Sequence, residues 1–133
     1  MKTILVAEDE PHIRRLIQVN LERAGYCVET AENGQQAWER LQQGGIDLLL
    51  TDLMMPVMDG FELIVRQREI HSATPLSTIV MQWPLDRRIL QAKGIDDVGE
   101  FLRVAAVINK PFNPMELLHI VNQYFEVPPP GGG

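Results

Sequence analysis

Residues 46–52 have the sequence Ile46-Asp47-Leu48-Leu49-Leu50-Thr51-Asp52. A short apolar run of this kind, bounded by turn residues on one side and a polar pair on the other, is typical of a parallel strand covered on both faces. The run ends in an acidic residue, Asp52. We therefore expect this segment at the centre of a sheet, with Asp52 at its carboxyl edge.

Four other segments also have the composition of strands. They are residues 4–7, 26–31, 78–81 and 105–108. Apolar residues at helical spacing and cap motifs predict helices from Pro11 to residue 24, from the cap Asn33 through Leu41, from the cap Asp59 onward, and from the cap Asn113 to Phe125. Between residues 84 and 104, Gly94 and Gly99 interrupt the pattern, so we expect one broken helix or two short ones. Alternating strands and helices predict an α/β fold with a parallel sheet and helices on both faces.

Length and composition limit the classes of function. The chain has 133 residues, the length of one domain, which we place at residues 1–126, with a Pro/Gly linker or tail at 127–133. A formal net charge of -6 disfavours direct binding to nucleic acid or anionic membranes. With no recognisable membrane span or signal peptide, we expect a cytoplasmic location. The single cysteine, Cys27, cannot form an internal disulfide, and we expect it to be a small buried residue.

Charged residues directly follow three of the predicted strands. Glu8-Asp9-Glu10 follow the first, Asp52 ends the third and Lys110 follows the fifth. We expect them to meet in one pocket, because sites in parallel sheets lie beyond the carboxyl ends of the strands. Clustered carboxylates raise the pKa of at least one member unless a cation is bound.

The residue types in this predicted pocket suit phosphoryl transfer. Mg2+ binds carboxylate oxygens together with waters and phosphate oxygens. A lysine supplies a positive charge for an anionic group, and charge stabilisation of this kind dominates phosphoryl transfer. One carboxylate can act as the nucleophile, as in aspartyl-phosphate chemistry.

Three segments in order then carry a resemblance to a known family. They are ILVAEDE at 4–10, LLLTDLMMPVMDG at 48–60 and NKPF at 109–112. Over nearly its whole length the chain resembles a response regulator receiver domain, the CheY-like module of two-component signalling. The resemblance implies a flavodoxin-like, doubly wound sheet of five parallel strands in the order 2-1-3-4-5.

The resemblance also implies roles for individual residues. Asp52 is the implied phosphoacceptor, and its phosphoryl group comes from a sensor histidine kinase or a phosphotransfer protein. The implied Mg2+ ligands are Glu8, through water, Asp9, Asp52 and the backbone carbonyl of Met54. Lys110 is implied to contact the phosphoryl group, and its bond to Pro111 to be cis. The module catalyses only transfer to and from its own Asp52, so we do not expect an enzyme. A downstream output domain or protein is a further expected partner, and homodimerisation stays open.

Three positions depart from the family pattern. Gln82 stands where Thr or Ser is usual, Trp83 where a small residue follows, and Val107 where Tyr or Phe is usual. The side-chain amide of Gln82 can still donate to a phosphoryl oxygen. We hypothesise that Trp83 fills the space normally used by the moving aromatic residue, so that the signal is carried differently or weakly.

Three functions are consistent with these features. The favoured one is a phosphorylatable receiver that switches partner binding. The second is a pseudo-receiver that signals by constitutive contact, which the loss of Thr/Ser and Tyr/Phe favours. The third is a Mg2+-dependent phosphohydrolase with an aspartyl intermediate, for which 133 residues leave no obvious cap domain or substrate pocket.

Overall fold

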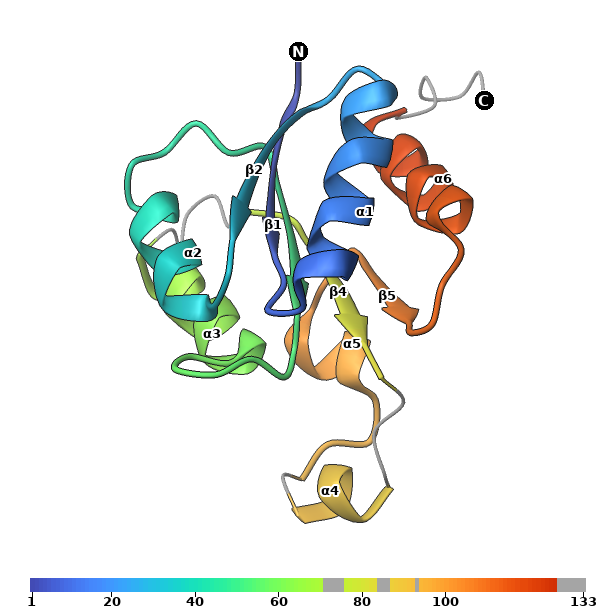
Figure 1. Ribbon diagram of the computed structural model, residues 1–133. Helices are drawn as coiled ribbons and strands as arrows, with labels where there is room; N and C mark the ends of the chain where they lie inside the picture. The colour runs from blue at the N-terminus through green and yellow to red at the C-terminus, as the bar shows by residue number, and fades with distance from the viewer. Residues whose placement is uncertain (71–75, 84–86, 93, 127–133) are drawn as a thin grey trace, which may run out of the picture.

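The computed structural model describes residues 1–70, 76–83, 87–92 and 94–126, and its five strands form a single parallel sheet (Figure 1). The strands are β1 (Thr3–Ala7), β2 (Cys27–Ala31), β3 (Leu48–Asp52), β4 (Thr78–Gln82) and β5 (Ala106–Asn109). Their order is β2-β1-β3-β4-β5, which confirms the predicted fold class. The central strand begins two residues later than predicted, at Leu48, and all five of its residues are buried.

Helices cover both faces of the sheet (Figure 1). They are α1 (Pro11–Arg23), α2 (Gly34–Leu41), α3 (Gly60–Ile70), α4 (Arg87–Ala92), α5 (Val98–Leu102) and α6 (Pro114–Phe125). Side chains from α1 and α6 pack on one face, whereas α2, α3 and α5 pack on the other. Among the described residues, none of these helices has both the length and the apolar character that a membrane span requires.

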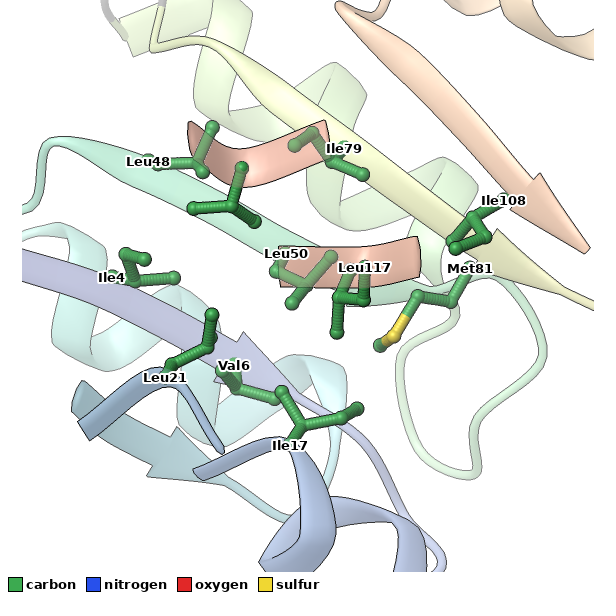
Figure 2. Packing of buried hydrophobic residues seen from close by; sticks show 11 residues of the cluster. Ile4, Val6, Ile17, Leu21, Leu48, Leu50, Ile79, Met81, Ile108 and Leu117 are labelled. Carbon is green, nitrogen blue, oxygen red and sulfur yellow. The ribbon is translucent and has the colours of Figure 1, made fainter. Parts of the chain in front are cut away.

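The core follows from the alternation of side chains along each strand. Ile4 and Val6 of β1 pack toward α1 and α6, whereas Leu5 and Ala7 pack toward α2 and α3. Figure 2 shows the first of these clusters, in which side chains of neighbouring strands meet those of α1 and α6. Its labelled members are Ile4, Val6, Ile17, Leu21, Leu48, Leu50, Ile79, Met81, Ile108 and Leu117. Because both faces are buried, the strands are held firmly and their carboxyl ends are fixed relative to one another.

The segment between β4 and β5 contains two short helices, the second of the two alternatives that the sequence left open. Gly94 follows α4 with a φ of 70°, a conformation that favours glycine. Gly99, however, does not interrupt a helix, because it lies inside α5. A Cβ atom there would lie 3.2 Å from Cγ2 of Val107, so glycine lets α5 pack closely on β5. In Figure 1, α4 stands away from the sheet beyond the end of β4.

One expectation about a side chain is wrong. Cys27 is exposed, not buried, because it begins β2, which lies at the edge of the sheet and pairs with β1. The predicted tail at 127–133 lies outside the described residues.

Candidate functional site

Three charged side chains from distant parts of the chain meet at the carboxyl edge of the sheet. Glu8 follows β1, Asp52 ends β3 and Lys110 follows β5. Lys110 Nζ donates to Glu8 Oε2 and to Asp52 Oδ2, both at 2.8 Å. The relative exposure of the three residues is 4% or less. The sheet order brings the three residues together, because β3 is adjacent to β1 and only β4 lies between β3 and β5.

Asp9 completes an acidic cluster with two of these residues. Glu8, Asp9 and Asp52 each offer a carboxylate oxygen, and the three oxygens lie within 4.8 Å of one another. Glu8 and Asp52 are buried and Asp9 is exposed. Lys110 Nζ bonds two of these three carboxyl groups, so the cluster has an excess of negative charge when Glu8 is ionised. Oxygen ligands with this charge fit Mg2+, which prefers carboxylates and retained waters.

Burial changes the protonation of this cluster. The pKa of Glu8 is raised from 4.5 to about 7, chiefly by burial and also by repulsion from Asp52, while the hydrogen bond from Lys110 acts in the opposite direction. Burial by itself lowers the pKa of Lys110, but hydrogen bonds to Asp52 and Glu8 outweigh it and the pKa is raised overall. Lys110 is therefore a stable cation at neutral pH, whereas Glu8 is close to its titration midpoint.

Backbone hydrogen bonds hold the carboxyl edge of the sheet together. Lys110 N donates to the carbonyl oxygen of Gln82 at 2.6 Å, and the Lys110–Pro111 peptide bond is cis, as the resemblance implied. Leu53 N donates to the carbonyl oxygen of Met81 at 3.2 Å. These bonds join the segments that follow β3 and β5 to β4, so that Asp52 and Lys110 have fixed positions.

Gly60 is a site-supporting residue that the sequence analysis did not single out. Its N–H donates to the carbonyl oxygen of Leu53 at 2.8 Å. A Cβ atom at this position would overlap the carbonyl oxygen of Asp52. Glycine at the start of α3 therefore allows the helix to lie directly against the end of β3, which carries Asp52. The Asp59-Gly60 pair gave a signal for the helix start but not for this close approach.

Two acidic residues near the site cap helices instead. Glu10 accepts from the backbone N–H groups of His12 and Ile13, which lowers its pKa, and so does not join the acidic cluster. Asp59 accepts from the backbone N–H of Glu62 at 2.9 Å, in agreement with its predicted role as a cap. The side chain of Met54 is exposed, and the metal role of its carbonyl stays a prediction.

The three departures from the family pattern lie close to Lys110 and β5. Gln82 Nε2 donates to Asn109 Oδ1 at 3.0 Å. Trp83 is 53% exposed, and its ring centroid lies 5.9 Å from Lys110 Nζ, a cation–π distance. Val107 packs among apolar residues from β4, α3 and α5. Trp83 is thus largely exposed beside Lys110 and Val107 packs against α5, and the hypothesis that Trp83 takes the space normally used by the moving aromatic residue stays a prediction.

The fold and the site together define a class of protein. A doubly wound parallel sheet with a buried lysine between two carboxylates, and a third carboxylate beside them, describes the CheY-like group of α/β domains. The model of the response regulator receiver domain matches residues 4–122. The chain therefore belongs to the response regulator receiver domain family.

Individual relatives agree with this assignment. The response regulator GtcR of Aneurinibacillus migulanus is 40% identical over 118 residues, which are 86% of this chain and 44% of GtcR. The receiver protein CpdR of Brucella abortus is 37% identical over 123 residues, which are 92% of this chain and 96% of CpdR. The chain thus spans less than half of the first relative and nearly all of the second.

Solved structures show the same fold. Chemotaxis protein CheY4 of Vibrio cholerae superposes with a TM-score of 0.77 at 28% identity, over 92% of this chain and 98% of that one. The response regulator TrrA of Thermotoga maritima, solved in complex with Mg(2+)-BeF, gives a TM-score of 0.73 at 30% identity over the same shares.

Proposed function

We propose that this chain is an active receiver, which accepts a phosphoryl group on Asp52 from a histidine kinase or phosphotransfer protein and thereby changes its binding to a partner. The observation that carries the proposal is the position of Lys110 Nζ, 2.8 Å from both Asp52 Oδ2 and Glu8 Oε2. Lys110 is thus already held beside the carboxylate of Asp52, which phosphorylation would convert into a negatively charged acyl phosphate.

Each residue of the site has a defined task in this reaction. A carboxylate oxygen of Asp52 forms a bond to phosphorus while the bond from phosphorus to the donor's imidazole nitrogen breaks, and the imidazole leaves with that electron pair. Lys110 stabilises the charge on the phosphoryl oxygens. Glu8, Asp9 and Asp52 would hold Mg2+, whose charge offsets that of the carboxylates and the phosphoryl group. The chain acts only on its own Asp52 and not on an external substrate.

A second candidate is the pseudo-receiver. Gln82 and Val107 replace the hydroxyl and aromatic residues that usually respond to phosphorylation, and this observation favours constitutive partner contact. The buried pairing of Lys110 with Asp52 favours the active receiver, because a chain without phosphoryl chemistry has no evident need for two buried carboxylates around one lysine.

Intact-mass analysis distinguishes the two. The wild type, Asp52→Asn and Asp9→Asn are incubated with Mg2+ and acetyl phosphate, and the wild type also with EDTA. We expect a phosphate adduct only in the wild type with Mg2+, and a strongly reduced adduct in Asp9→Asn. No adduct in a folded wild-type sample would support the pseudo-receiver.

A further inference from the structure

Arg14 of α1 binds the backbone of the acidic segment that follows β1. Its Nη1 atom donates to the carbonyl oxygen of Glu8 at 2.9 Å. The side chain reaches this carbonyl because Arg14 lies in the first turn of α1, and the Cα–Cβ bonds of a helix tilt toward its N-terminus. Only 18% of the Arg14 side chain is exposed, whereas the next residue, Arg15, is exposed. Arg14 is therefore packed against the segment that carries Glu8 and Asp9.

This hydrogen bond acts on the peptide group that joins Glu8 to Asp9. The carbonyl of Glu8 and the N–H of Asp9 belong to one planar unit, so a donor that fixes the carbonyl also restricts the Cα position of Asp9. Asp9 is the exposed member of the acidic cluster, and its carboxylate oxygen lies within 4.8 Å of those of Glu8 and Asp52. Arg14 thus acts on the position of Asp9 through the backbone.

The carboxylate of Glu8 is held by other groups. Its Oε1 atom accepts from the N–H of Glu10 at 3.3 Å, and its Oε2 atom accepts from Lys110 Nζ at 2.8 Å. Loss of Arg14 would leave both of these bonds in place. Its effect would therefore fall mainly on the peptide group that leads to Asp9.

The charge of Arg14 does not explain its place beside a cation site. A guanidinium group and Mg2+ are both positive, so as a charge alone Arg14 would weaken metal binding. Its Nη2 atom also lies 3.8 Å from Oε1 of Glu32, but that side chain is 65% exposed, and an exposed ion pair contributes little. The hydrogen bond to Glu8, in contrast, can favour metal binding through geometry.

We propose that Arg14 is a positioning residue for Mg2+, which holds the peptide group between Glu8 and Asp9 so that the Asp9 carboxylate faces those of Glu8 and Asp52. This inference rests on the proposed function, of which Mg2+ binding at the acidic cluster is a part. It extends the metal site to a cation on α1 that acts through the backbone.

The test measures the dissociation constant for Mg2+ by NMR, from the backbone amide resonances of residues 8–10 during titration with MgCl2. Arg14→Met removes the donors and the charge but keeps a long apolar stem that can pack as before. We expect it to raise the dissociation constant about tenfold, as the loss of a group that orients a metal ligand does. Arg14→Lys keeps a donor for the Glu8 carbonyl and should bind Mg2+ more tightly than Arg14→Met.

Arg15→Met is the matched control, because it removes the same charge from an exposed position of α1. Its dissociation constant for Mg2+ should equal that of the wild type or be lower, since a nearby positive charge is lost. The sign of the change therefore distinguishes positioning from charge. Circular dichroism verifies that each variant is folded.

Phosphorylation by acetyl phosphate gives a second readout. In Arg14→Met, the Mg2+ concentration that gives half of the maximal rate should rise by the same factor as the dissociation constant. The rate at saturating Mg2+ should stay within about twofold of the wild type, because only the binding of the metal is weakened. A general loss of structure would lower the maximal rate as well.

The outcomes separate the two proposals. A wild type that binds Mg2+ and is phosphorylated, with an Arg14→Met variant that binds Mg2+ equally well or better, would overturn the role of Arg14 and leave the proposed function intact. The same conclusion follows if Arg15→Met weakens Mg2+ binding as much as Arg14→Met does. Absence of both Mg2+ binding and a phosphate adduct in the wild type would overturn both proposals.

Discussion

At the scale of single residues, the least expected side chain is Gln67. It lies on α3 with a relative exposure of 1%, and neither Nε2 nor Oε1 has a hydrogen-bond partner within the described residues. Leu63 and Ile64, one turn earlier, are also buried, so Gln67 lies on the apolar face of the helix. A buried amide that makes no hydrogen bond is unusual in a folded protein and opposes folding.

Replacing this amide by an apolar side chain of similar size should stabilise the domain. We expect Gln67→Leu to raise the free energy of unfolding by about 1 to 3 kcal/mol, because the desolvation of two unpaired polar atoms is removed. Urea unfolding monitored by circular dichroism measures this change. Glu69→Leu, at an exposed position of the same helix, is the control and should stay within about 0.5 kcal/mol of the wild type. A Gln67→Leu variant less stable than the wild type would mean that the amide has an unrecognised partner.

At the scale of elements, the approach of α3 to β3 determines where Asp52 lies. Gly60 begins α3 against the carbonyl oxygen of Asp52, and Gly34 begins α2 in equally close contact with the carbonyl oxygen of Met58. Two helices therefore start at glycines that pack on the end of β3 and the loop after Asp52. The first residues of α2 and α3 thus pack closely against the backbone of residues 52–58, and this packing restricts the conformation of that segment.

A methyl group at Gly60 should displace this loop. We expect Gly60→Ala to lose about 1 to 3 kcal/mol of stability, because the backbone must move to relieve the overlap. Phosphorylation by acetyl phosphate should also fall, since Asp52 shifts relative to Lys110. Asp59→Ala is the matched control: loss of the cap should cost about 1 kcal/mol, yet leave phosphorylation near that of the wild type. Equal phosphorylation of Gly60→Ala and the wild type would contradict this account.

At the scale of the whole molecule, we expect the acidic cluster to link stability to pH and to Mg2+. The pKa of Glu8 is about 7 in the folded state against an ordinary value of 4.5, so the folded protein binds more protons than the unfolded chain between these values. The stabilisation from protonated Glu8 is complete below pH 4.5 and is lost as the pH rises through 7. A cation that binds the ionised cluster would oppose this loss.

Without divalent ions, the free energy of unfolding should therefore fall between pH 5 and pH 8. The contribution of Glu8 is up to about 3 kcal/mol, given about 1.4 kcal/mol per pKa unit. Urea unfolding in EDTA at several pH values measures this contribution of Glu8. Addition of 10 mM Mg2+ should raise the free energy of unfolding by roughly 1 to 3 kcal/mol, chiefly at the alkaline end of the pH range. Glu8→Gln stays neutral and should show a much flatter profile. Superimposable profiles for the two proteins would rule out this role of Glu8.

The sequence by itself determined the order of strands and helices, their caps and the fold class, because these depend on residues close together in the chain. The acid-rich end of the first strand, Asp52 and Lys110 could be assigned to one edge of the sheet because parallel strands present their carboxyl ends together. The differences are local: β3 starts at Leu48, Gly99 lies inside α5 and Cys27 is exposed.

The tertiary structure alone decided which side chains at that edge touch. Glu8 shares Lys110 with Asp52, whereas its neighbour Glu10 caps α1. The pairing of Gln82 with Asn109 joins residues 27 positions apart, and depends on β4 and β5 being neighbours in register. Contacts between side chains on different strands are properties of the assembled sheet, because the sheet brings together residues that lie far apart in the chain.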